Sequence, residues 1–440
     1  MNLVEEPSAL STRETPAAAQ PANARLLLAV AILIFAFGAF VRLLPTAKFN
    51  AFGPDEALYR DVIVKLDRVG LSHYPEICQL HIEDQRNPKS QAVLPPTRFF
   101  YIFCGWVAKR VAFGDAPPVH LLARDGVARD PALVSLHRVS AIFSVLFLGL
   151  AGFVAWRMCG SGIGLGVLTL LAGSPLAIHM SQHAFIDGIV AFLATLCLWL
   201  LWENLQRPNH FGWLTSFAAA LAVLVITKEN SFFVYVALCG LVAVNRWAKF
   251  GTVTPRLVIA GIFGPAFGVI LLITLAGGVE PFIEIYRLLV TKAQALPYAI
   301  LTGDGPWYRY IVESAAIEPI TLCLAIGAAF ALPWKDRALR FFVGFVVFSY
   351  AIMCNVRYGM NLRYTTIWLL PLCALAAAQI VALASRAGSR ALVLSVAMFA
   401  AVCGYGLRQY QIFFVDRAIY ELAPEDLLRA VDMIKDPPPR

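Results

Sequence analysis

Charged residues are scarce in this sequence. Asp, Glu, Lys and Arg make up 15% of its 440 residues, whereas soluble proteins usually carry about 25%. Hydrophobic residues reach 59% and the mean hydropathy is +0.69, against an apolar content of ~45–50% in soluble domains. This composition excludes a soluble enzyme, a disordered chain and a nucleic-acid-binding domain. It predicts a protein that crosses a membrane several times.

The formal net charge of +8 and the isoelectric point near 9.0 would otherwise suggest a nucleic-acid partner. Most Lys and Arg residues, however, lie in loops between long apolar runs. Basic loops of this kind set the orientation of membrane proteins. We therefore expect membrane lipids, and no nucleic acid, among the partners of this chain.

No C-x-x-C spacing occurs among the nine cysteines, so the sequence holds no recognisable zinc motif of that kind. Seven of them lie in or beside apolar runs, where cysteine usually serves as a small hydrophobic residue. Cys78 and Cys104 lie in a long polar loop and would pair only if that loop faces an oxidising compartment. The sequence leaves this disulfide open.

A transmembrane helix needs about 20 apolar residues. The first such run covers residues 25–44, and no comparable run follows before Val139. The later runs cover residues 138–156, 162–178, 185–202, 212–226, 231–247, 257–276, 315–333, 340–356, 364–384 and 391–408. Together they predict eleven spans. Residues 98–113 are also apolar but contain Lys109 and Arg110, which favours an interfacial helix over a twelfth span.

The short loops that carry clustered basic residues, such as Arg337 and Arg340, are predicted to face the cytoplasm together with the N-terminus. Arg357 and Arg363 fall on the opposite side, against the rule, and so call for a functional reason. The predicted organisation is a disordered cytoplasmic N-terminus at 1–24, a transmembrane domain at 25–408 with external loops at 46–137 and 277–314, and an external tail at 409–440.

An acidic pair follows a Gly-Pro turn shortly after the first predicted span, where residues 52–61 read FGPDEALYRD. Acidic residues suit a helix N-terminus. Val62, Ile63 and Leu66 then recur at helical spacing, which predicts an amphipathic helix along the membrane surface. A helix cap would explain the acids by itself, but their position beside the first span makes them candidates for chemistry.

A first span followed by this motif on an external helix resembles the glycosyltransferases of the GT-C fold. Among them, the protein O-mannosyltransferases and the lipid A aminoarabinose transferases are the groups that the sequence resembles. Six segments carry the likeness, in the same order and on the same side of the membrane, over about residues 25–385. They are residues 53–59, 94–101, 137–140, 184–187, 224–230 and 363–364.

The resemblance implies an all-α membrane protein of the GT-C fold, with juxtamembrane helices in the first external loop. It implies transfer of a single hexose or pentose from a polyprenyl-phosphate donor to a hydroxyl acceptor, which is lipid A, another glycan or a protein. It also favours a bacterial inner membrane with the site on the external, periplasmic face. Two positions depart from the family pattern. Leu94 replaces a lysine, so the phosphate contact of that lysine is either made by Arg98 or Lys89 or is absent, and Glu229 replaces a turn glycine.

Glycosyl transfer needs a carboxylate that takes the acceptor's proton and cations that stabilise the departing polyprenyl phosphate. Motif residues of both kinds gather at one predicted membrane face. Asp55 is the predicted general base, and Glu56 is predicted to orient it or to contact the sugar. Arg363, Lys228 and Arg98 are the predicted phosphate ligands.

Asp187 is predicted to bind the acceptor or a metal. His179, His183 and Asp187 are spaced i, i+4, i+8, which on one helix would form a face that resembles a metal site. Interfacial histidines beside a helix start explain the same spacing, and we favour that interpretation. No cofactor is required by the sequence, and a divalent metal is left open.

Three aromatic residues are predicted sugar contacts, namely Tyr59, Trp307 and Tyr364. Trp307 follows a Gly-Asp-Gly-Pro turn in the second external loop. Aromatic residues at an interface most often anchor a protein in the membrane. A membrane-anchoring belt is therefore the alternative for Trp307.

Three other functions are compatible with a polytopic chain. A secondary transporter or lipid flippase would show inverted repeats, broken helices and ionisable residues near mid-membrane, and no repeat is visible here. An inactive scaffold would not need the acidic pair. Transfer of whole oligosaccharides is disfavoured by the short second external loop.

Overall fold

The computed structural model describes residues 21–44, 53–87, 90, 94–119, 129–296, 299–300, 303–331, 336–357, 359–422 and 424–430. All regular secondary structure within these ranges is helical. Seven stretches are long and apolar enough to cross a membrane: Arg25–Leu43, Pro131–Cys159, Asp187–Gln206, Ser231–Ala248, Pro255–Ala276, Leu362–Ser385 and Gly388–Asp416. They contain helices α1 (Pro21–Leu43), α6 (Pro131–Cys159), α9 (Asp187–Gln206), α11 (Ser231–Ala248), α12 (Pro255–Ala276), α18 (Leu369–Ser385) and α19 (Ala391–Tyr410).

Each predicted apolar run contains a helix, but the predicted count of eleven spans is not confirmed. Helices α7 (Ser161–Ala172) and α8 (Pro175–Gln182) form one pair that is bent by 55°. With this pair, the described residues hold up to eight spans. Helices α10 (Phe211–Val225) and α16 (Pro319–Ala331) have 15 and 13 residues. At 1.5 Å per residue they are shorter than the ~30 Å hydrocarbon layer.

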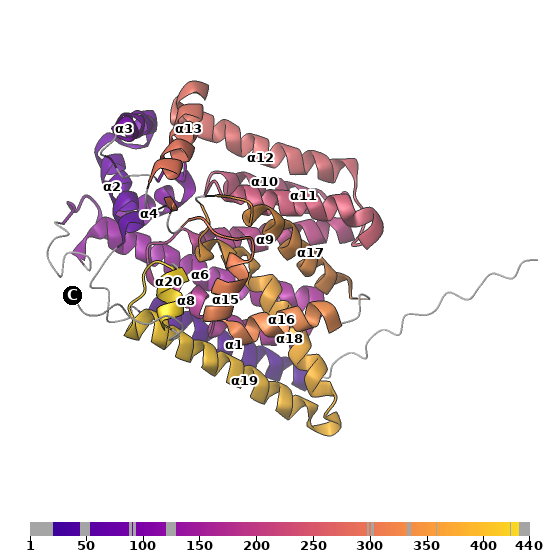
Figure 1. Ribbon diagram of the computed structural model, residues 1–440. Helices are drawn as coiled ribbons and strands as arrows, with labels where there is room; N and C mark the ends of the chain where they lie inside the picture. Colours follow the sequence, from indigo (N-terminus) through magenta and orange to yellow (C-terminus); the bar gives the residue numbers. More distant parts are fainter. Residues whose placement is uncertain are drawn as a thin grey trace, which may run out of the picture.

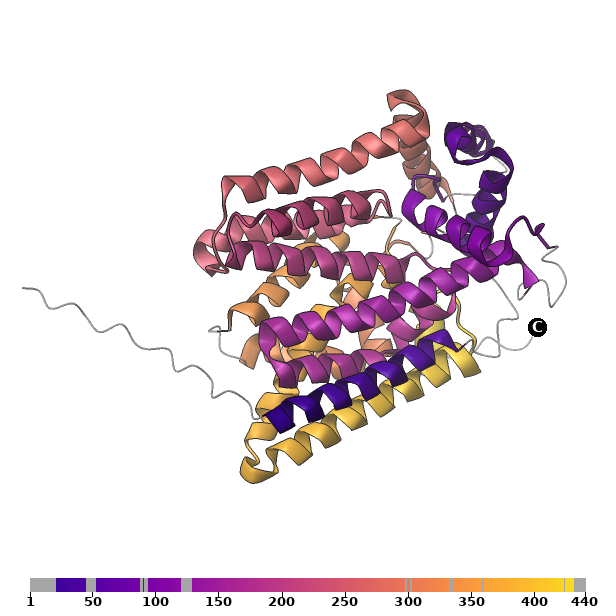
Figure 2. The ribbon, with the colours of Figure 1, turned by 180° about the vertical axis from the view of Figure 1, so that it is seen from behind.

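Six shorter helices outside the long spans lie toward one end of the bundle, away from the start of α1 (Figures 1 and 2). They are α2 (Pro54–Val69), α3 (Tyr74–Arg86), α4 (Phe99–Phe113), α13 (Val279–Ala295), α15 (Arg309–Ile317) and α20 (Pro424–Ala430). Helix α13 packs on α3, and α20 packs on α15. The two predicted external loops and the C-terminal tail therefore meet at the same end.

Helix α2 begins where the sequence predicts. Gly53 is its N-cap and Pro54 its first residue, and the side chain of Glu56 accepts a hydrogen bond from the Gly53 amide at 3.0 Å. Ile63 and Leu66 are buried on its inner face. The predicted amphipathic helix is confirmed.

The apolar run at 98–113 forms α4, which packs against α2. The two basic residues that interrupt this run both bind Asp67 of α2: Lys109 Nζ forms an ion pair with it, and Arg110 Nε lies 2.8 Å from its carboxylate. Lys109 and Arg110 therefore hold the juxtamembrane helix α4 to α2. Cys78 and Cys104 are both free thiols, so the disulfide that the sequence left open is not formed.

Candidate active site

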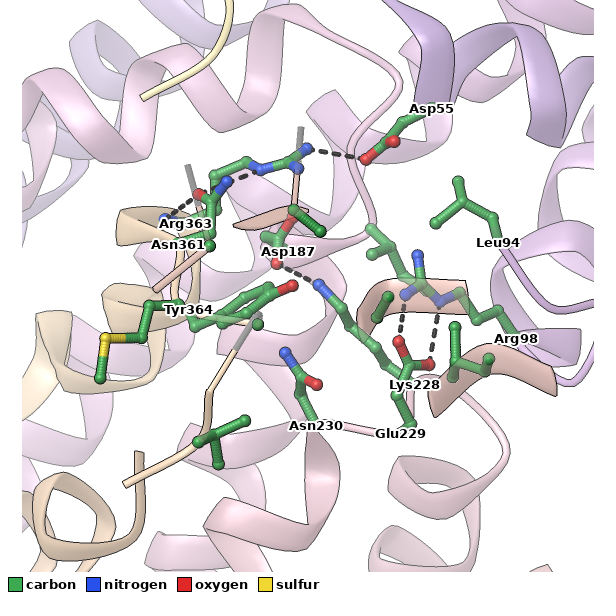
Figure 3. Close-up of a pocket in the computed structure, with 18 of the residues that line it drawn as sticks. Asp55, Leu94, Arg98, Asp187, Lys228, Glu229, Asn230, Asn361, Arg363 and Tyr364 are labelled. Carbon is green, nitrogen blue, oxygen red and sulfur yellow. Dashed lines mark hydrogen bonds and ion pairs between the residues drawn. The ribbon is translucent and has the colours of Figure 1, made fainter. Parts of the chain in front are cut away.

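A cavity of about 600 Å³ lies at the end of the bundle where the juxtamembrane helices gather. Its walls come from helices α2, α9, α11 and α13, from the segments before α4 and α9, from the turn between α10 and α11, from parts of the segments 296–303 and 355–364, and from one residue of the C-terminal segment. Four acids and four cations line it: Asp55, Asp187, Glu229, Glu421, Arg98, Lys228, Arg357 and Arg363. Figure 3 shows most of them pointing toward one another. Such a concentration of charge beside a membrane is costly unless it has a use.

Asp55 reaches this cavity from the first turn of α2. Its Oδ2 atom lies 3.0 Å from Nη1 of Arg363, which comes from the 3₁₀ helix η2 (Leu362–Trp368) just before α18. The side chain of Arg363 is 9% exposed and that of Asp55 is 23% exposed. Arg363 lies on the predicted external side, where the positive-inside rule disfavours a cation. Its ion pair with Asp55 gives a reason for a cation at this position.

Lys228 and Asp187 form a second pair, with Nζ 2.7 Å from Oδ1 and both side chains 3% exposed. Lys228 belongs to the turn between α10 and α11, and Asp187 begins α9. The ammonium group also lies over the ring of Tyr364, 4.5 Å from its centroid. Burial lowers the pKa of Lys228, and the negative charge of Asp187 opposes this shift.

Arg98 and Glu229 form a third pair. Nε of Arg98 lies 3.0 Å from one carboxylate oxygen and Nη2 contacts the other, which is a two-pronged contact. The remaining Nη1 donates to the hydroxyl of Tyr59 at 2.6 Å. Burial raises the pKa of Glu229, but the charge of Arg98 outweighs this and leaves that pKa below its ordinary value. Leu94 and Glu229, the two positions that depart from the pattern of the resemblance, both line this cavity.

We expect a double-mutant cycle to show strong coupling between these two residues. Arg98→Met or Glu229→Met alone leaves one charge buried without its partner, which should cost roughly 3–5 kcal/mol of unfolding free energy. The double variant should lose less than the sum of the two. Melting temperatures in detergent would measure this, with the exposed pair Arg86–Glu284 as a control expected to contribute about 0–1 kcal/mol. Additive losses at Arg98 and Glu229 would contradict the expectation.

Glu56 does not line the cavity, although it was predicted to orient Asp55 or contact sugar. It is fully buried. Besides the Gly53 amide, it accepts hydrogen bonds from the Ala184 amide at 2.6 Å and from His137 Nε2 at 3.0 Å. Burial alone would raise its pKa, but the hydrogen bonds and charges of His137 and His183 hold the pKa of Glu56 well below its usual range. Its contacts fasten the start of α2, and thereby the segment that carries Asp55, to α6 and to the turn before α9.

Glu56→Gln should therefore destabilise the protein by about 1.5–3 kcal/mol, the contribution of hydrogen bonds to a charged group. Because the folded pKa is depressed, this stability is present above the unfolded value near 4.5 and is lost as pH falls below it. The melting-temperature difference between variant and wild type should be full at pH 7 and shrink below pH 4.5. Glu83→Gln, at an exposed position on α3, is the control. Equal melting temperatures for Glu56→Gln and wild type would refute the role.

His179, His183 and Asp187 do not share one helical face, so the metal-like arrangement that their spacing left open as an alternative is not formed. Helix α8 ends at Gln182, His183 has an extended backbone, and α9 begins at Asp187. The chain turns because the Ala184 amide bonds to Glu56 rather than to a helical carbonyl. Within the described ranges, no group of three or more His, Cys, Asp or Glu is arranged to hold a metal ion.

His179 and His183 instead pack against the C-terminal segment beside the cavity. His179 is buried, stacks on Phe414 with ring centroids 4.0 Å apart, and its Nε2 donates to the Tyr420 carbonyl at 3.1 Å. The His183 ring lies 4.9 Å from that of Tyr420. Asp187 does reach the cavity, where its partner is Lys228.

Of the predicted sugar contacts, Tyr59 and Tyr364 line the cavity and Trp307 does not. Trp307 is 62% exposed, and its carbonyl accepts a hydrogen bond from the Tyr350 hydroxyl at 2.6 Å. Lys89, the alternative phosphate ligand, lies outside the described residues. Glu421, which lines the cavity from the tail beyond the last span, was not predicted from the sequence. Its only sequence signal is an acid on the predicted external side, which is too common to single it out.

No protein-family model matches the sequence, and no curated protein matches it either. Solved structures do match. The archaeal oligosaccharyltransferase AglB from Archaeoglobus fulgidus, in complex with an inhibitory peptide and a dolichol-phosphate, superimposes with a TM-score of 0.57 at 12% identity. The match covers 91% of this chain and 57% of AglB. The chain has the GT-C fold.

A second oligosaccharyltransferase structure agrees with this assignment. The apo form of the Archaeoglobus fulgidus oligosaccharyltransferase has a TM-score of 0.55 at 12% identity and covers 90% of this chain and 56% of its own. ArnT from Cupriavidus metallidurans bound to undecaprenyl phosphate has a TM-score of 0.48 at 15% identity, covering 94% of this chain and 76% of ArnT. The chain thus spans a little over half the length of the oligosaccharyltransferases. The GT-C fold predicted from sequence is confirmed.

Proposed function

We propose that this protein is a membrane glycosyltransferase that moves a single sugar from a polyprenyl-phosphate donor to a hydroxyl acceptor. The observation that carries the proposal is one cavity lined by Asp55 and by three largely buried cations, Arg98, Lys228 and Arg363. The GT-C fold and the dolichol-phosphate named in the AglB complex support it. A cavity of about 600 Å³ falls within the usual range for small-molecule sites.

The donor would lie with its phosphate among the three cations and its chain along the apolar part of the cavity. That part is formed by residues of α11, α13 and the segment before η2, including Phe233, Val290 and Met360. Arginine is suited to contact phosphate through two N–H groups at once. The cations would stabilise the negative charge that develops on the departing polyprenyl phosphate.

Asp55 would act as the general base. An acceptor hydroxyl gives its proton to the Asp55 carboxylate while its oxygen attacks the anomeric carbon, and the bond from that carbon to the phosphate oxygen breaks with inversion. In the structure Asp55 is paired with Arg363. A donor phosphate that draws Arg363 away would leave the Asp55 carboxylate free of its ion-pair partner and open to the acceptor hydroxyl. Donor binding would then prepare the base.

Asp187 would hold Lys228 in place, since these side chains are each other's close partner. The acceptor would approach from the external side, and lipid A, another glycan or a protein hydroxyl each satisfy the chemistry. The site would face the external side, because basic loop residues such as Arg246, Arg256 and Arg386 belong to the predicted cytoplasmic side. The resemblance to GT-C enzymes favours a bacterial inner membrane, in which this side would be the periplasmic one.

The bent pair α7–α8 does not favour a transporter or flippase over this function. The charge beside the bend, Arg42, donates to the Leu171 carbonyl at 2.6 Å and to the Gly38 carbonyl at 3.0 Å. On the other side of the bend, Glu318 accepts from the hydroxyl of Ser174, the N-cap of α8. Arg42 therefore binds a carbonyl at the end of α7, and Glu318 binds the N-cap residue of α8. Both charged groups thus have a structural role at the break between the two helices.

The proposal is tested with purified protein in nanodiscs and a panel of radiolabelled polyprenyl-phosphate sugars. We expect one donor to be hydrolysed or transferred, which would identify the sugar. A parallel reaction with chelator decides whether a divalent metal is needed. If no donor on the panel binds or turns over, single-sugar transfer is refuted, and pyrophosphate-linked oligosaccharides and lipid transport become the functions to test.

A further inference from the structure

The C-terminal segment crosses the site after α19. One π-helical turn, Gln411–Asp416, ends this span, and the chain then lies against the turn that precedes α9. There the Tyr420 carbonyl accepts the hydrogen bond of His179, and the Tyr420 ring lies 5.1 Å from that of Phe185. These contacts hold the segment beside the cavity rather than free in solvent.

The same segment contacts the motif that carries the base. Gly53, the N-cap of α2, is buried against the Tyr420 ring, and a Cβ atom at Gly53 would overlap that ring. Only glycine leaves room for Tyr420 at this distance. The segment and the start of α2 are therefore packed as one unit, two residues before Asp55.

Glu421 follows Tyr420 and faces the cavity. Its Oε2 atom lies 3.6 Å from Nη2 of Arg363, whose Nη1 lies 3.0 Å from Asp55. One guanidinium group therefore lies between two carboxylates. The side chain of Glu421 also hydrogen-bonds to Asn361, which helps to orient it.

Glu421 differs from the other three cavity acids in its partners. Asp55, Asp187 and Glu229 each have a cation within 3.0 Å. The Oε2 atom of Glu421 is buried and has no hydrogen-bond partner among the described residues. A buried carboxylate oxygen in this state is costly, and such groups in a binding cavity are commonly satisfied by a ligand. A carboxylate oxygen accepts hydrogen bonds, so the ligand group that satisfies it must be a donor. An ionised phosphate oxygen has no hydrogen to donate and cannot fill this role.

We infer that Glu421 is a substrate-binding residue, which accepts a hydrogen bond from a hydroxyl group held in the cavity beside Arg363. The inference rests on the proposed glycosyl transfer and adds a residue from outside the region of family resemblance. The hydroxyl belongs either to the transferred sugar or to the acceptor. The chemistry is the same in both cases, and kinetics separate them.

The test compares Glu421→Ala and the isosteric Glu421→Gln with wild type, using the donor that wild type turns over. Hydrolysis of that donor in water reports on sugar binding, and transfer to added lipid A reports on acceptor binding. Glu421→Ala removes the carboxylate that accepts this hydrogen bond, so it should raise one of the two KM values by about tenfold or more. Because Glu421 does not bind the phosphate, the affinity for sugar-free undecaprenyl phosphate should stay within twofold of wild type or improve.

A raised KM in donor hydrolysis assigns the hydroxyl to the sugar, and a raised KM only in transfer assigns it to the acceptor. Glu425→Gln, on α20 with a 67% exposed side chain, is the matched control and should behave as wild type. Two unchanged KM values, or an equal loss of affinity for the sugar-free lipid phosphate, would overturn the role of Glu421. Wild type that turns over no donor would instead refute the proposed function itself.

Discussion

Asp55→Asn should lower kcat for glycosyl transfer by about 10²–10⁴-fold, the range for loss of a general base. The amide keeps the shape of the side chain but cannot take the acceptor's proton. Arg363 loses its ion-pair partner and becomes more available to the donor phosphate, so donor affinity should be kept or increased. Single-turnover kinetics with the identified donor, together with binding of sugar-free polyprenyl phosphate, measure the two effects separately.

Asp61→Asn is the matched control, because Asp61 lies on the same helix with a 56% exposed side chain. It should leave both kcat and donor affinity near wild type. Asp55→Asn with wild-type kcat would remove Asp55 as the base. A parallel fall in donor affinity and melting temperature would show instead that Asp55 mainly holds Arg363 in place.

Arg363→Ala should lower kcat/KM by about 10²–10³-fold, as expected when a group that stabilises developing charge is removed. It should also weaken binding of sugar-free polyprenyl phosphate, in contrast to Asp55→Asn. Arg363→Lys keeps the charge but loses the planar two-pronged contact, so it should recover only part of the activity. These readouts are kcat/KM with the donor and the dissociation constant of the lipid phosphate.

Arg386→Ala, at an exposed position in the loop after α18, is the control for a change of net charge. The double variant Asp55→Asn with Arg363→Ala should lose less than the product of the two single effects, because the pair acts as a unit. If Arg363→Ala binds the lipid phosphate as wild type does, Arg363 is no phosphate ligand. The anion would then have to lie between Arg98 and Lys228.

The start of α2 was predictable because its signals are local. Gly53, Pro54 and the two acids specify a capped helix within four residues, and the apolar spacing specifies its buried face. The sequence does not separate the two acids, however. Asp55 lines the cavity, while Glu56 points to His137 and the Ala184 amide. Adjacent residues on a helix point about 100° apart, and the neighbours that they meet come from distant segments.

His179, His183 and Asp187 do not lie on one helix, for a related reason. Periodicity assumes that the helix continues, but the carboxylate of Glu56 binds the Ala184 amide from another part of the chain and ends that continuity. The predicted count of eleven spans is not confirmed by the described residues, because apolar composition identifies buried helices as well as membrane-crossing ones. Helices α10 and α16 are apolar but short.

Composition and apolar runs by themselves determined that this chain is a helical membrane protein. The resemblance carried by six short ordered motifs implied the GT-C fold and a candidate base near the first span. These features depend on residues close in sequence, so they can be read without coordinates. Tertiary structure decided which charges share a cavity. Asp55 and Arg363 lie 308 residues apart in the chain, and Glu421 comes from a tail with no motif. Ion pairs over such separations leave no local pattern, because burial and packing rather than spacing determine which charges meet.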